Sequence, residues 1–326
     1  MGGALAFYAT CMTCEVAILN RRGVALAAAA SNAIFPISSA PVAIMTLGAS
    51  MMDIPWEVIA ANYIHHLGER TFATIDEYAD DFFSYIEMAG ALFPPQKQIE
   101  CFSRCVRSIW SDYSDRMHTC GDSLGSILAE DRRELLDADD LCPANFGDQV
   151  VQAYASALDE LESEIFGYTN LTDALRAELR ATVAQMYGKD WCHPSDDGYV
   201  IFAGTGSDEP FPSVLAYAVS TVVAGRLRRA RRDVVRIGPD CDAGILPFGR
   251  RETIDLLIDG IHPDLLAFAN ELQPHGFERQ PAPFVPCIAE LSRRGLARIA
   301  ESLVMLSAVD EPIQLALLAK NIAMPA

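Results

Sequence analysis

Two pairs of apolar runs near the start of the chain constrain the fold more than any other feature. Residues 15–28 hold two such runs around a turn-forming segment at 20–23, and residues 33–47 hold two more around a joint at 38–41. The joint, Ser-Ser-Ala-Pro, cannot extend a helix and suits a tight turn. Each run is continuously apolar rather than alternating, which is expected of strands covered on both faces. The sequence therefore predicts two buried strand pairs.

Helices are predicted immediately after these strands. Periodic apolar residues favour a helix over 54–67, with Asp53 as its N-cap, and another over 74–88. Thr74 and Glu77 have the spacing of a capping box at the start of the second helix.

The remaining chain returns to strands after a long helical stretch. Residues 96–190 have helical patterning and acidic character, whereas strands are predicted at 199–225, 233–237 and 313–319. This order predicts a single domain over 1–326 that carries a helical insertion packed on it, rather than two independent domains.

Composition excludes several classes of protein and of partner. Of 326 residues, 51% are hydrophobic and 21% charged, which excludes disorder, collagen-like repeats and a disulfide mini-protein. The 25 basic against 44 acidic residues give a formal charge of -19, which repels phosphates at long range. We therefore expect neither nucleic acid nor a membrane as a partner.

The cysteines and the apolar segments indicate a cytoplasmic protein. The nine cysteines are scattered along the chain, and residues 2–11 are apolar but too short and without the basic region of an export signal. Residues 24–49 are interrupted by polar residues and prolines, so they do not predict a membrane span. Cysteines in the cytoplasm are normally reduced, so nine scattered cysteines without a disulfide pattern fit this interpretation.

Four N-terminal segments resemble the opening of one known family. The first four strands of proteasome-β-like N-terminal-nucleophile (Ntn) hydrolases are similar to residues 13–19, 23–29, 31–38 and 41–49 of this chain. The segment 31–38 is similar to the third strand of bacterial proteasome-like proteins in particular. The resemblance implies an α+β fold, a four-layer αββα sandwich with two mostly antiparallel sheets face to face. It places the helices at 54–67 and 74–88 in one outer layer.

The resemblance also implies where catalytic residues would stand. In this family a terminal threonine attacks a carbonyl, a lysine lowers its pKa, an aspartate holds the lysine, and a backbone N–H stabilises the oxyanion. These roles map the nucleophile to Thr13 and the oxyanion donor to Gly48, but Ala29 and Ala33 occupy the positions of the aspartate and the lysine.

Two functions are compatible with this pattern. The favoured one is a catalytically impaired binding or assembly module, because both charged assistants are absent. The alternative is a threonine amidohydrolase or peptidase, which requires Thr13 to be exposed as a new N-terminus, either by initiation at Met12 and removal of that methionine or by cleavage of residues 1–12 as a propeptide. Thr13 can also be simply the start of a strand, and Cys14 is a weaker candidate nucleophile because its register points it across the sheet.

Soft metal ligands occur in two places, and in both a structural role is preferred. Residues 11–14 have Cys-x-x-Cys spacing but no second pair in a comparable context. Cys101, Cys105, His118 and Cys120 could hold zinc, although buried thiols in an apolar helix are the better interpretation. No metal or cofactor is therefore predicted.

Three further features have structural interpretations. His65 and His66 are expected at a helix end, where cations are favoured. Gly204-Thr205-Gly206 lacks the lysine and following helix of a phosphate loop and is predicted to connect two strands. The arginine cluster at Arg226–Arg232 is expected at a solvated hairpin tip or helix end. The functional alternative for that cluster is contact with an acidic protein partner, or with the acidic insertion of another copy in a homo-oligomer.

Overall fold

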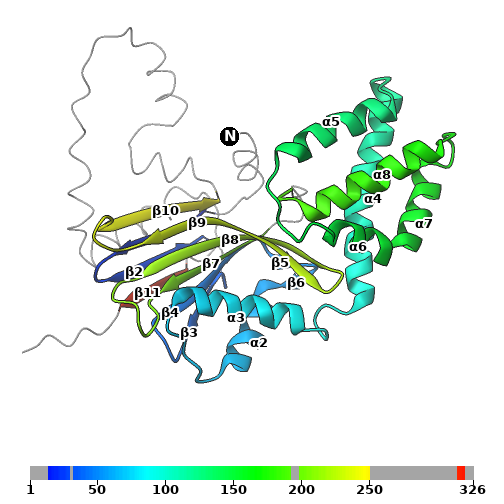
Figure 1. Ribbon diagram of the computed structural model, residues 1–326. Coiled ribbons are helices and arrows are strands. Elements are labelled where there is room, and N and C mark those ends of the chain that lie inside the picture. The colour runs from blue at the N-terminus through cyan, green and yellow to red at the C-terminus, as the bar shows by residue number, and fades with distance from the viewer. Residues whose placement is uncertain (1–13, 30–31, 192–197, 250–313, 320–326) are drawn as a thin grey trace, which may run out of the picture.

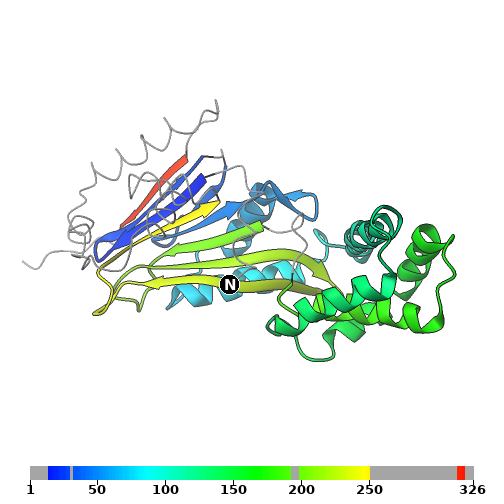
Figure 2. The same ribbon diagram turned by 90° about the horizontal axis from the view of Figure 1, so that it is seen from above.

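The computed structural model describes residues 14–29, 32–191, 198–249 and 314–319. Two antiparallel sheets lie face to face, and helices cover the outer side of one of them (Figures 1 and 2). The first sheet has the order β10-β1-β2-β11, with strands β10 (Ala243–Gly249), β1 (Cys14–Asn20), β2 (Gly23–Ala28) and β11 (Gln314–Ala319). The second has the order β3-β4-β7-β8-β9, with strands β3 (Ile34–Ile37), β4 (Val42–Leu47), β7 (Gly198–Gly204), β8 (Ser213–Val223) and β9 (Arg226–Arg236).

Both predicted strand pairs are confirmed. β1 pairs with β2 through a turn in which the side chain of Asn20 accepts a hydrogen bond from the Arg22 N–H at 2.8 Å. β3 pairs with β4 across the expected joint. β7 and β8 are joined through Gly204-Thr205-Gly206, so the predicted strand connection is also confirmed.

Strand β4 shows why these runs are apolar throughout. All six of its residues are buried. Val42 and Ile44 point to the core beneath the helices, whereas Ala43 and Met45 point to the core between the sheets. A strand with a packed layer on each side has no solvent-facing positions, so no polar alternation develops.

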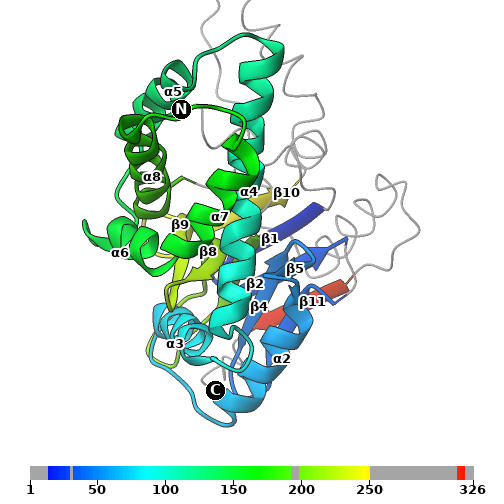
Figure 3. The same ribbon diagram turned by 90° about the vertical axis from the view of Figure 1, so that its right-hand side faces the viewer.

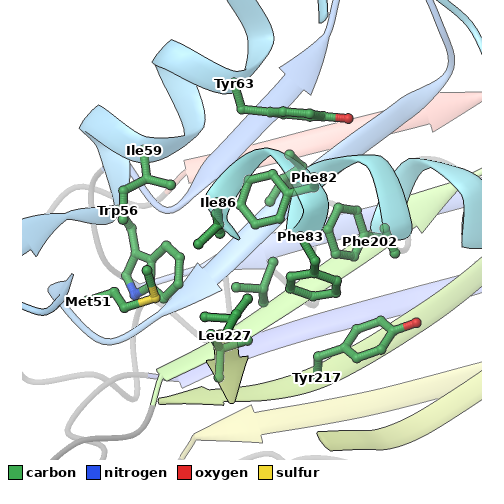
Figure 4. Packing of buried hydrophobic residues seen from close by; sticks show 14 of the residues in the cluster. Met51, Trp56, Ile59, Tyr63, Phe82, Phe83, Ile86, Phe202, Tyr217 and Leu227 are labelled. Atoms are coloured by element: carbon green, nitrogen blue, oxygen red, sulfur yellow. The ribbon is translucent and has the colours of Figure 1, made fainter. Parts of the chain in front are cut away.

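Helices α2 (Trp56–Leu67) and α3 (Ile75–Met88) form the layer that covers the second sheet, as predicted. Figure 4 shows their aromatic side chains packed on the sheet, with the rings of Phe82 and Phe83 5.5 and 5.6 Å from that of Phe202. Thr74 caps α3 through a hydrogen bond from the Glu77 N–H at 3.3 Å, which confirms the capping box.

The prediction that Asp53 caps α2 is wrong. The residue that precedes α2 is Pro55, and no side chain caps this helix. Asp53 instead lies in the turn of a short hairpin formed by β5 (Ser50–Met51) and β6 (Ile54–Pro55), where its carboxylate bonds to side chains of α4 (Pro95–Thr119).

The segment between α3 and β7 is helical. It contains α4, α5 (Leu124–Asp137), α6 (Phe146–Ala153), α7 (Ala155–Phe166) and α8 (Asp173–Gly188). These helices enclose a core of their own, to which β8 adds Val223. They lie at one end of the sheets, and α4 runs along the junction (Figure 3). In the part of the chain that is described, no helix is long and apolar enough to cross a membrane.

The arginine cluster lies within a strand, which corrects its predicted place. β9 begins at Arg226 rather than at residue 233, and only Arg226 adjoins the turn that joins β8 to β9. A strand can hold so many arginines because they find partners on neighbouring elements. Arg229 lies 3.5 Å from Asp80 and its guanidinium 4.3 Å from the ring centre of Phe83.

Candidate functional site

A cleft of about 440 Å³ lies where the sheets meet the helical segment. Its walls come from the turn after β4, the β5–β6 hairpin, α4, the end of α8, and strands β8 and β9. The lining residues are Gly48, Ala49, Ser50, Met52, Asp53, Cys101, Arg104, Cys105, Ser108, Met186, Tyr187, Trp191, Ser220, Thr221 and Arg228. The cleft therefore contains Gly48, one of the residues singled out from the sequence.

The β5–β6 hairpin forms one rim of the cleft and ties it to α4. Met52 and Asp53 have φ angles of 51° and 61°, the left-handed conformation that a two-residue type I′ turn requires. The Asp53 carboxylate accepts two hydrogen bonds from Arg104, both at 3.0 Å, and one from Lys97 at 2.6 Å. These bonds, first from Arg104 and then from Lys97, lower the pKa of Asp53 to about 2. Asp53 is therefore ionised at neutral pH.

Cys101, which lines the cleft, is not suited to nucleophilic chemistry. The Cys101 sulfur accepts a hydrogen bond from Arg104 at 3.1 Å, but burial raises the pKa of this thiol and keeps it protonated. The zinc alternative is wrong for this set, because His118 lies about 20 Å further along α4 than Cys105, given the rise of an α-helix. Among the described residues no cluster of three or more His, Cys, Asp or Glu side chains could hold a metal ion.

A β-bulge brings polar side chains from β8 and β9 into the cleft. Val219 pairs with Arg229 and Val222 pairs with Leu227, so Ser220 and Thr221 stand opposite the single residue Arg228. A bulge of this kind interrupts the alternation of side chains and often occurs beside functional sites. Here it places three polar residues in the same wall of the cleft.

Arg228 is the most unusual of these residues. It is 5% exposed, and its Nη2 donates to the carbonyl oxygens of Met186, Lys189 and Trp191 at 3.0, 2.8 and 2.6 Å. Its guanidinium lies 5.2 Å from the ring centre of Tyr187, while its Nε has no hydrogen-bond partner. Within residues 14–29, 32–191 and 198–249, Arg228 forms no ion pair with a carboxylate.

Ser220 is a second buried polar group in this wall. The residue is 5% exposed, and its hydroxyl has no hydrogen-bond partner. Buried polar atoms are nearly always hydrogen-bonded in folded proteins, so an unsatisfied hydroxyl needs a specific explanation. Together, Arg228 and Ser220 give the cleft unused hydrogen-bond donors.

Of the positions mapped from the family resemblance, Gly48 lines the cleft, whereas Ala29 and Ala33 are not among its lining residues. Thr13 is outside the described residues. Cys14 begins β1 and pairs with Gly249, and the N–H of Ala29 donates to the Cys14 carbonyl at 3.1 Å. Ala29 is therefore next to the entrance of β1. Ala33 is 4% exposed and packs in the core between the sheets.

Arg21 lies far from the entrance of β1, where the family resemblance would require a charged residue. It lies in the turn at the opposite end of β1, about 20 Å from Cys14 given the rise of an extended strand. Its guanidinium is 2.6 Å from the Asp242 carboxylate. Both its place and its partner keep it away from the entrance of β1.

The other predicted features have structural roles. His65 and His66 lie in the last turn of α2, as expected. Arg231 and Arg236 bond to Asp76 at the start of α3, so they connect β9 to the helix layer.

Sequence reasoning missed the polar wall of the cleft. Ser220 lies in a strand whose sequence is mainly apolar, and Arg228 is one of five arginines that the sequence does not distinguish. It also missed Glu15, which is 1% exposed inside β1. A charged residue in an otherwise apolar strand was the available signal for Glu15, whereas the bulge that defines the cleft has no signature in the sequence.

No protein-family model matches the chain, and no curated protein is detectably similar to it.

Proposed function

We propose that the chain is a divergent Ntn-hydrolase-like protein that acts as a non-catalytic binding or assembly module. Two features of the described residues support the fold assignment: the sheets lie face to face and are antiparallel, and α2 and α3 cover one outer side. The fourth layer of the αββα sandwich stays a prediction. The proteasome-like family membership likewise rests on the N-terminal sequence resemblance.

The observation that carries the non-catalytic assignment is the pair of alanines at positions 29 and 33. Ala29 is bonded to Cys14 at the entrance of β1, and Ala33 is buried between the sheets. Neither methyl group can supply a charge or transfer a proton. Loss of about 3 kcal/mol of electrostatic assistance would lower the rate of a reaction at least a hundredfold.

One observation favours the alternative, a threonine amidohydrolase or peptidase that uses Thr13. Gly48 is exposed at the end of β4, has a φ of 90° and lines the cleft. A backbone N–H at such a turn is the kind of donor that stabilises an oxyanion. This donor alone provides no base and no activated nucleophile, so the binding module is the preferred function.

Covalent labelling distinguishes the two functions. The full chain and a chain that begins at Thr13 are each incubated with a β-lactone electrophile, and adducts are located by intact-mass and peptide mass spectrometry. We expect no adduct at Thr13. Stoichiometric labelling that is lost in Thr13→Ala and retained in the matched control Thr10→Ala would show an active nucleophile and overturn the proposal.

A further inference from the structure

We propose that the cleft binds a small monocarboxylate with an apolar body, held by Arg228 and Ser220. This inference specifies the ligand class of the binding role proposed above and rests on that role. The carboxylate is placed against the polar wall formed by the bulge of β8. The apolar body is placed against the side chains at the end of α8.

Charge balance in the cleft calls for one negative charge. Three ionised side chains line it: Asp53, Arg104 and Arg228. Asp53 pairs with Arg104 through two hydrogen bonds of 3.0 Å, and with Lys97, which lies outside the lining, through one of 2.6 Å. This leaves the charge of Arg228, which is 5% exposed and has no carboxylate partner in the described part of the chain. A buried cation is costly unless it is paired, and an anionic ligand would pair it.

The donors that remain unused have the chemistry of a carboxylate site. The Nε of Arg228 and the hydroxyl of Ser220 are buried and have no hydrogen-bond partner. Both residues belong to the bulge, where Ser220 and Thr221 face Arg228 across the strand pair. A guanidinium matches the planar geometry of a carboxylate, and charge-assisted hydrogen bonds are about twice as strong as neutral ones. The residues of the bulge therefore carry the hydrogen-bond donors that a carboxylate ligand needs.

The rest of the cleft is suited to an apolar body. Met186 and Tyr187 are 2% and 4% exposed, and Trp191 and Met52 also line the cavity. The volume of about 440 Å³ is within the range of about 300–1,000 Å³ typical of small-molecule sites. A cavity with an apolar wall and a few converging donors favours an amphipathic ligand over a bare inorganic anion.

A monoanion fits better than a phosphate. Arg228 is the only lining cation without a carboxylate partner in the described part of the chain, so one negative charge pairs it and the second charge of a dianion would have no partner. The chain as a whole carries a formal charge of -19 and repels multiply charged anions. Carboxylate and phosphate are therefore separate arms of the test.

The test is isothermal titration calorimetry with the full chain. The probes are phenylacetate and hexanoate, their neutral amides, and inorganic phosphate. We expect at least one carboxylate to bind with a dissociation constant at or below about 1 mM, and its amide and phosphate to bind at least about tenfold more weakly. Failure of both carboxylates to bind, or equal binding of the amide or of phosphate, would overturn the proposal.

Two variants locate the binding. Ser220→Ala should weaken carboxylate binding at least about threefold and Arg228→Lys at least about tenfold, because a lysine lacks the planar fork. Arg231→Lys is the matched control: it lies on the same strand, faces α3 through Asp76 and should leave affinity unchanged. If Arg228→Lys does not fold, Ser220→Ala decides. Unchanged affinity in Ser220→Ala would refute the assignment. Carboxylate binding is independent of labelling at Thr13, so failure of this inference is distinguishable from failure of the proposed function.

Discussion

Removal of the Ser220 hydroxyl should stabilise the unliganded protein. The hydroxyl is buried without a partner, and Ser220 is 5% exposed. Burial of a hydroxyl that forms no hydrogen bond costs about 1–3 kcal/mol, whereas replacement of serine by alanine removes only one atom and leaves little empty space. We therefore expect Ser220→Ala to raise the free energy of unfolding by about 1 kcal/mol.

The assay for Ser220→Ala is urea unfolding followed by circular dichroism, with the midpoint and slope compared between variants. Thr182→Val is the matched control, because the Thr182 hydroxyl is buried but donates to the Glu178 carbonyl at 3.0 Å. Loss of that satisfied bond should lower stability by about 1 kcal/mol. A drop in stability of similar size in Ser220→Ala would mean that its hydroxyl is partnered, and would refute the reasoning for the cleft.

Three other changes test the structure around the cleft and the helix layer. Asp53→Asn keeps a residue suited to the left-handed turn but removes the negative charge that pairs with Lys97 and Arg104, so it should cost about 0.5–1 kcal/mol at neutral pH by chemical denaturation. The pKa of Asp53 is lowered in the folded state, so the stabilisation it provides is complete above about pH 4 and is lost as the pH falls through about 2. The difference in free energy of unfolding between the parent and Asp53→Asn should therefore shrink over that range, and a constant difference would contradict this prediction. Thr74→Ala should lower stability by about 1 kcal/mol through loss of the cap on α3, and a thermal melt without a shift would show that the cap does not contribute. Gly206→Ala should destabilise by at least about 2 kcal/mol, because the added carbon would lie 2.2 Å from the Ala73 carbonyl oxygen, whereas Gly90→Ala meets no atom within 4 Å and should melt like the parent.

Local patterns in the sequence predicted most of the strands and the helix layer. The apolar runs of β1 to β4 and the capping box of α3 depend on residues close in sequence, and both were confirmed. Predictions failed where distant residues decide the outcome. Asp53 resembles a helix cap by position, yet Lys97 and Arg104 from α4 compete for its carboxylate.

The strand β9 shows the same limit. Its arginines predict a solvated turn when considered alone, but carboxylates at Asp76 and Asp80 on α3 make a strand possible. The polar wall of the cleft was beyond prediction for a related reason. A bulge is a difference in residue count between two paired strands, and neither strand records that difference in its own sequence.

The entrance of β1 and the cleft differ in the polar and charged side chains that each contains. The two positions that the family resemblance assigns to charged residues hold alanines: Ala29 bonds to Cys14 at the entrance of β1, and Ala33 is buried in an apolar core that packs without any ligand. In the cleft the reverse holds: Arg228 and Ser220 keep buried donors without partners, at a cost of about 1–3 kcal/mol for each unsatisfied group. Folded proteins carry few such groups, and an anion bound in the cleft would satisfy both at once. We therefore expect the cleft to bind the ligand, and the residues at the entrance of β1 to contribute only to the stability of the two packed sheets.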